Sequence, residues 1–120
     1  MYHPLESATI RFDADDVTVS GFTLTGGMRG VDGKGDRTQI IDNIILSRVI
    51  LIGSNQTIAQ NSIEYGLLCD GSYNNIAANE FIGASMGGVA VGGSFNVVYS
   101  NMINDGRNRR EWYWEHNNQK

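Results

Sequence analysis

The feature that most constrains this chain is a repeat that returns five times at intervals of 18 to 22 residues. The aligned copies read IRFDADDVTV, VDGKGDRTQI, VILIGSNQTI, LLCDGSYNNI and VAVGGSFNVV, and they begin at Ile10, Val31, Val49, Leu67 and Val89. Their first and tenth positions are always aliphatic, and their fifth position is glycine in every copy after the first. A fixed period of this length is typical of solenoid proteins, in which each repeat is one turn of the stack.

The second half of each copy repeats as well. An asparagine follows the tenth-position aliphatic by three residues in four copies, as Asn43, Asn61, Asn79 and Asn101. Apolar alternation over only three to five residues predicts strands and not helices. Strands this short cannot form a sheet within one copy, so each must pair in parallel with its counterpart about 4.8 Å away. The asparagines are then stacked, and we expect their amides to hydrogen-bond from coil to coil.

The motif G-S-x-N-x-I followed by x-x-N-x-I resembles the repeats of the right-handed parallel β-helix, or pectate-lyase-like, superfamily. The resemblance covers roughly residues 10–103. It implies an all-β fold, a right-handed parallel β-helix solenoid of about five coils, here as a single domain over residues 1–120. The superfamily that it resembles includes polysaccharide lyases, hydrolases and epimerases, phage tail spikes and noncatalytic surface modules, and a shared fold does not determine which activity is present.

The tail, residues 104–120, is expected to close the stack, because a solenoid leaves an apolar core and an unpaired strand edge at each end. Trp112 lies 23 residues after Val89, which puts Trp114 in the column of Val91. The two rings therefore predict a C-terminal cap. The alternative is that they form a stacking platform for sugar rings.

The composition limits the classes of partner that this chain is expected to bind. The formal net charge of −4 argues against a nucleic-acid surface, which requires a basic patch. The single cysteine, Cys69, excludes an internal disulfide and falls in an inward column, so we expect it to be buried. The first ten residues lack the pattern of a signal peptide, and no stretch approaches the ~20 apolar residues of a membrane span, so no membrane partner is expected. The cellular compartment stays open.

One corner of the coils differs in length from copy to copy. It is long after the first, fourth and fifth copies and minimal at Leu46-Ser47-Arg48 and Glu64-Tyr65-Gly66. Two walls with a gap of about 14 Å between them are therefore expected, which suits an oligosaccharide or a peptide. The predicted ligand-binding residues at this corner are Arg29, Arg48, Glu64, Tyr65 and Met86. The alternative is a solvated edge that tolerates insertions.

Acidic residues gather in the first two copies. The repeat places Asp15 over Asp36 and Asp13 over Lys34, with Arg37 beside them. Such a cluster suits Ca²⁺ binding or paired acid and base roles, and the resemblance implies enzymes that combine acidic clusters with a basic residue. The predicted catalytic residues are accordingly Asp13, Asp15, Asp36, Lys34 and Arg37. The alternative is a set of surface ion pairs around an ordinary turn.

Some outward positions are apolar where water is expected. These residues, Ile41, Ile44, Ile50, Ile52 and Leu68, predict a surface for self-association, since exposed apolar patches usually mark partner sites. The leading hypothesis is a noncatalytic module, with no required cofactor, that binds a carbohydrate or acts as a rigid interaction surface and forms a homo-oligomer. The alternatives are a minimal polysaccharide lyase or epimerase and a purely structural scaffold.

Overall fold

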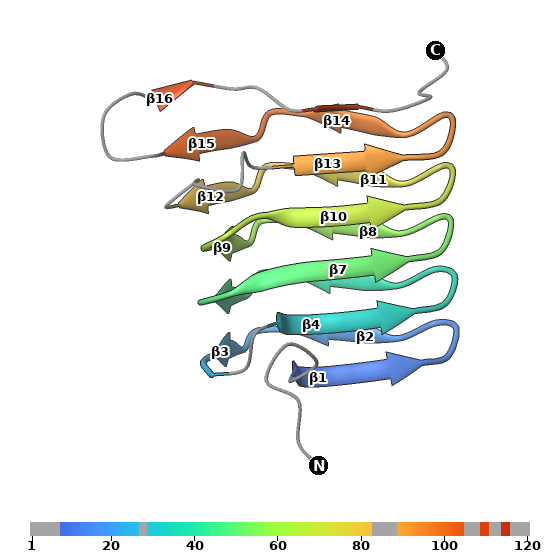
Figure 1. The fold of residues 1–120 in the computed structure, drawn as a ribbon, viewed down its shortest axis with the longest axis horizontal. Coiled ribbons are helices and arrows are strands. Elements are labelled where there is room, and N and C mark those ends of the chain that lie inside the picture. The colour runs from blue at the N-terminus through green and yellow to red at the C-terminus, as the bar shows by residue number, and fades with distance from the viewer. Residues whose placement is uncertain (1–7, 27–28, 83–88, 105–108, 111–113, 116–120) are drawn as a thin grey trace.

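The computed structural model describes residues 8–26, 29–82, 89–104, 109–110 and 114–115, with side chains over 8–26, 29–82 and 89–102. Over these residues the chain is a parallel β-solenoid of about five coils. Figure 1 shows the coils rising in sequence order from the N-terminus. The chain runs along the front strands toward the right and returns behind them as it rises, so the solenoid is right-handed (Figure 1).

Each coil contributes one strand to each of three sheets. The first sheet contains β1 (Ala8–Asp13), β4 (Arg29–Lys34), β7 (Arg48–Ile52), β10 (Leu67–Asp70), β13 (Val89–Gly92) and β17 (Trp114–Glu115). The second contains β2 (Thr18–Ser20), β5 (Gln39–Ile41), β8 (Thr57–Ala59), β11 (Asn75–Ala77) and β14 (Val97–Tyr99). The third contains β3 (Thr23–Leu24), β6 (Ile44–Ile45), β9 (Ser62–Ile63), β12 (Glu80–Ile82), β15 (Met102–Asn104) and β16 (Arg109–Arg110). The pairs are parallel except β15 with β16. The described residues contain no helix long and apolar enough to cross a membrane.

The predicted register is confirmed strand by strand. In the first sheet Phe12, Gly33, Leu51, Cys69 and Val91 are paired neighbours, as the aligned copies require. The tenth-position aliphatics pair in the same way in the second sheet. These inward columns form the hydrophobic core, and Ile40, Ile58 and Ile76 are fully buried. Burying one such side chain contributes about 1.5–3 kcal/mol, so the columns supply the main driving force for stacking.

The asparagine ladder is also confirmed. The Nδ2 atom of Asn43 donates to Oδ1 of Asn61, that of Asn61 to Asn79, and that of Asn79 to Asn101, at 2.9–3.0 Å. Each of these amides also donates to a backbone carbonyl of the preceding coil, as Asn61 does to Ile40 at 2.8 Å. The ladder thus satisfies buried backbone groups at the turn between the second and third sheets, and it fixes the register there.

The first coil uses one large ring to fill its interior. The Phe12 side chain is half-buried and packs against the core. Its neighbour in the next coil is Gly33, and a Cβ atom at Gly33 would overlap the Phe12 ring. The glycine in this inward column therefore reflects the size of the residue below it.

The C-terminal end differs from the prediction in its register. The backbone of β17 pairs with β13, and Trp114 lies opposite Ala90, not opposite Val91. The prediction was one residue off, because the connection from the fifth coil carries no repeat signal from which to count. The predicted packing of Trp112 and Trp114 over the core lies outside the described side chains.

Candidate functional site

The predicted acidic cluster is brought together, but its carboxylates already support the backbone. Asp13 is paired with Lys34 in the register of β1 and β4. Oδ1 of Asp15 accepts a hydrogen bond from the backbone N–H of Asp36 at 2.9 Å, and Oδ1 of Asp36 accepts one from the N–H of Ser54 at 3.0 Å. Serine hydroxyls continue the same pattern in the later coils. Asp15 and Asp36 are therefore the first two members of a turn ladder, a series of side-chain-to-backbone hydrogen bonds that links the same turn in successive coils.

Arg37 is held by a neighbouring carboxylate. Its Nε and Nη2 atoms donate to the two oxygens of Asp16 at 2.7 and 3.0 Å, and Nη2 lies 3.7 Å from Asp15. The hydrogen bond to Asp16 raises the pKa of Arg37, and the same bond lowers the pKa of Asp16. A proton held this firmly on the guanidinium opposes a role for Arg37 as a base. Within the described part of the chain no three or more His, Cys, Asp and Glu side chains are placed to hold a metal ion.

The predicted ligand-binding corner is only partly assembled in the described residues. Arg29 lies in β4 and donates to Asp32 at 2.8 Å. Arg48 and Tyr65 line one shallow groove, whereas Glu64 is not among its lining residues. The predicted walls are residues 25–30 and 82–88, and their segments 27–28 and 83–88, with Met86, lie outside the described residues, so the gap between the walls stays a prediction.

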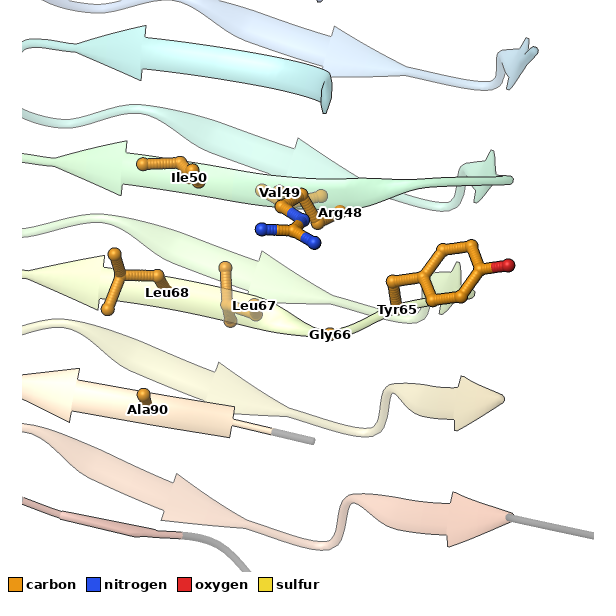
Figure 2. Close-up of a pocket in the computed structure, with 8 residues that line it drawn as sticks. All are labelled: Arg48, Val49, Ile50, Tyr65, Gly66, Leu67, Leu68 and Ala90. Atoms are coloured by element: carbon orange, nitrogen blue, oxygen red, sulfur yellow. The ribbon is translucent and has the colours of Figure 1, made fainter. Parts of the chain in front are cut away.

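This groove, of about 200 Å³, lies on the outer face of β7 and β10. Figure 2 shows Ile50, Leu68 and Ala90 one above another on successive strands at one end, with Arg48 and Tyr65 toward the other. Its lining is mainly aliphatic, and it continues onto the open face of the first sheet. The groove joins two sequence predictions, the ligand corner and the apolar stripe, in one place.

The outer face of the first sheet carries two columns of side chains. The first column is Arg11, Asp32, Ile50, Leu68 and Ala90, from coil 1 to coil 5. The second column is Asp13, Lys34, Ile52, Asp70 and Gly92. Both columns are charged in coils 1 and 2, and coil 3 is apolar in both. Ile52 and Leu68 are each nearly half exposed, at 46% and 44%.

Two residues of the predicted association surface lie elsewhere. Ile41 is in β5 of the second sheet, and Ile44 is in β6 of the third. They therefore do not extend the stripe formed by Ile50, Leu68 and Ile52, and the association surface of these five residues stays a prediction. The turn at Asp42 and Asn43 moves the chain from one sheet to the next between the two isoleucines.

A third feature was not predicted, a hollow with aromatic sides. It has a volume of about 330 Å³ and is lined by Tyr73, Asn74, Asn75, Phe95, Val97 and Tyr99. The Tyr73 and Phe95 rings are stacked, with centroids 5.1 Å apart and planes 9° apart. Tyr73, Phe95 and Tyr99 are each about half exposed, and Tyr73 most of all, at 59%. None of the lining residues is charged.

The backbone conformation at Tyr73 and Phe95 is one that aromatic residues seldom adopt. Tyr73 and Phe95 have φ values of 60° and 61°, in the left-handed region. The same turn position is occupied by Asp16, Arg37 and Asn55 in the earlier coils. Bulky side chains are disfavoured in this conformation, whereas Asn and Asp accept it readily. The turn adopts this conformation in every coil, and the two rings stack on each other between coils 4 and 5, yet each still leaves about half of its surface exposed.

The sequence did contain a signal for this hollow. Tyr73 and Phe95 occupy the seventh position of their copies, where a turn residue would be expected, and Tyr99 follows the tenth position of the fifth copy. The aliphatic and asparagine columns dominate the repeat, and a change confined to one outward turn column is a much weaker signal.

Comparisons with protein-family models, with curated proteins and with solved structures found no significant match. Function is therefore inferred from the geometry of the chain itself.

Proposed function

We propose that this chain is a noncatalytic β-solenoid module that binds an uncharged carbohydrate in the aromatic hollow. The observation that carries the proposal is the exposed Tyr73–Phe95 stack, which is kept at backbone positions that disfavour both residues. We also propose membership of the pectate-lyase-like superfamily, supported by the G-S-x-N-x-I motif and the parallel register of its copies.

The chemistry of the lining supports a sugar. Pyranose rings have apolar C–H faces that pack on aromatic side chains, and hydroxyl groups around their rim. The hollow offers aromatic side chains together with neutral hydrogen-bonding groups, the phenol hydroxyls of Tyr73 and Tyr99 and the exposed amide of Asn75. Because no lining side chain is charged, we expect preference for neutral glycans over acidic ones.

The state of the acidic cluster supports a binding role over catalysis. General acid–base chemistry needs carboxyl groups that are free to exchange protons with a substrate. Asp15 and Asp36 instead accept backbone hydrogen bonds within the turn ladder, and Arg37 is bound to Asp16. The lyase or epimerase alternative consequently has less support from the described side chains than the binding hypothesis.

The test is to measure glycan binding by variants whose substitutions are compatible with the fold. Replacing Tyr73 and Phe95 by Asn introduces the residue that coil 3 already uses at this turn position, Asn55. The double variant Tyr73→Asn, Phe95→Asn should keep its far-ultraviolet circular dichroism spectrum. It should nevertheless lose binding to neutral glycans on an array and in titration calorimetry.

Tyr65→Ala is the matched control, since Tyr65 is a similarly exposed tyrosine on the first-sheet groove. It should bind as the parent does. Binding that survives in the double variant, binding that is lost only in Tyr65→Ala, or a parent chain that binds no glycan would each overturn the proposal.

A further inference from the structure

The charged and apolar side chains on the outer face of the first sheet are arranged so that the same face of a second copy is complementary to them. In coil 1 the first column carries Arg11 and the second carries Asp13. In coil 2 the signs are reversed, with Asp32 in the first column and Lys34 in the second. Coil 3 has isoleucine in both columns, Ile50 and Ile52, and coil 5 has only the small residues Ala90 and Gly92. Within each of these coils the two columns are therefore complementary to each other.

We propose that two copies pair through this face, around a two-fold axis that runs parallel to the solenoid axis. Such an axis keeps each coil opposite the same coil of its partner and reverses the strand direction. The first column of one copy then faces the second column of the other. Sheets that pack face to face lie about 10 Å apart with nearly aligned strands, which this arrangement satisfies.

The pairing gives opposite charges or apolar contacts in most coils. Arg11 faces the partner's Asp13. Asp32, which Arg11 and Arg29 of the same chain already contact at 3.2 and 2.8 Å, faces the partner's Lys34. Ile50 packs on the partner's Ile52, and both are apolar side chains that the single chain leaves at its surface. Because the axis is two-fold, every such contact occurs twice. Complementary charges of this kind select the orientation of a complex more than they strengthen it.

The other two-fold arrangement, with the axis parallel to the strands, fits less well. Each column would then face itself with the coil order reversed. When coil 3 is at the centre, Asp32 meets the partner's Leu68, and Arg11 meets the partner's Ala90. Only Lys34 would meet an opposite charge, that of the partner's Asp70. Arg11, Asp13 and Asp32 would be desolvated against apolar or small residues, which is unfavourable.

One contact in the proposed arrangement is mismatched. In coil 4, Leu68 faces the partner's Asp70, and Asp70 is exposed in the single chain. Replacing this carboxylate by a small neutral residue removes a desolvation cost from both copies of the contact. Asp70→Ser should therefore tighten self-association several-fold.

The area of the face indicates the protein concentrations at which self-association should be measured. Five coils at about 4.8 Å and strands of about five residues give a footprint of roughly 24 by 17 Å. That is about half of the ~800 Å² per partner of a standard interface, so weak association that depends on concentration is expected. Sedimentation equilibrium from about 1 to 500 µM should show the parent chain approaching twice its mass of 13.2 kDa.

A charge exchange tests the geometry itself. The variant Asp13→Arg puts two like cations across each coil-1 contact, and Arg11→Asp puts two like anions there. Each variant alone should associate at least about tenfold more weakly than the parent chain. An equimolar mixture should recover the parent's affinity, because every coil-1 contact is then between opposite charges.

The control variants distinguish loss of the coil-1 contact from a general effect of surface charge and from loss of folding. Thr18→Arg and Thr18→Asp change an exposed residue of the second sheet in the same coil, and neither should alter the dimer. Thermal unfolding of each variant confirms that it is folded. A parent chain that stays monomeric at 500 µM overturns the proposal, as does either coil-1 variant with the parent's affinity, or a mixture that associates no better than its components.

Discussion

The asparagine ladder gives the sharpest test of what holds the coils together, and Asn61, like Asn79, makes four hydrogen bonds through its side chain. Its Oδ1 atom accepts from the backbone N–H of Asn43 at 2.9 Å and from Nδ2 of Asn43 at 3.0 Å. Its Nδ2 atom donates to the carbonyl of Ile40 at 2.8 Å and to Oδ1 of Asn79 at 2.9 Å. The side chain is 3% exposed, so water does not readily replace these partners.

Asn61→Ala should therefore be costly. The amide of Asn43 keeps its bond to the carbonyl of Val19, and Oδ1 of Asn79 keeps the backbone N–H of residue 61. The buried N–H of Asn43 loses its side-chain acceptor, which costs about 1–3 kcal/mol, and three further hydrogen bonds are lost at about 1 kcal/mol each. The expected loss is about 4–6 kcal/mol, a large part of the 5–15 kcal/mol that stabilises a typical domain.

Denaturant unfolding followed by circular dichroism measures this loss directly. Asn75→Ala is the matched control, because Asn75 is exposed on the outer face of β11, and its free energy of unfolding should change by less than about 0.5 kcal/mol. Asn61→Asp keeps the size of the side chain but cannot donate, so it should be at least as harmful as the alanine variant. A loss below about 1.5 kcal/mol in Asn61→Ala would refute the assignment of the ladder as a main source of stability.

Three further predictions follow from single contacts. Burial raises the pKa of the Cys69 thiol to about 12, so a thiol reagent at pH 8 should label this residue only at the rate of unfolding. Gly33→Ala forces the Phe12 ring to move and should cost about 1–3 kcal/mol, and adding Phe12→Leu should recover part of that loss in the same unfolding assay. The Arg37 hydrogen bond lowers the pKa of Asp16, so its contribution is present above the carboxyl's unfolded pKa of about 3.9 and is lost as pH falls through the folded value. Asp16→Asn should flatten that acid limb of the stability curve.

The inward half of this molecule could be predicted from its sequence. Leu51, Cys69 and Val91 stack as the alignment required, because an inward position must match the same position above and below it. The asparagine column followed from the same reasoning, since a buried amide at a turn has few possible partners other than its copies. Each coil therefore has the same inward pattern as its neighbours. One sequence thus contains several examples of the residue types that each inward position accepts.

The outward half could not be predicted as fully. Ile41 and Ile44 are three residues apart, yet a turn between them places them on different sheets, and apolar character alone did not reveal this. Outward positions follow no common pattern, because water accepts many side chains there. Tyr73 and Phe95 illustrate the difficulty, since their position in the repeat is a turn site with no expected side-chain partner.

That difference between the two halves is also the reason to look for function on the outer surfaces. A residue that repeats in every coil is explained by stacking, whereas one that departs from its column requires another cause. The first column changes from charged Asp32 to apolar Ile50 and Leu68, and the seventh-position turn changes from Asn55 to Tyr73. The first change exposes apolar surface, and the second puts bulky residues at positive φ, where Tyr73 and Phe95 stack on each other between coils 4 and 5 while staying about half exposed. Both changes begin in the middle coils and leave the core columns intact. The binding proposed at these two surfaces would explain why these side chains are left exposed.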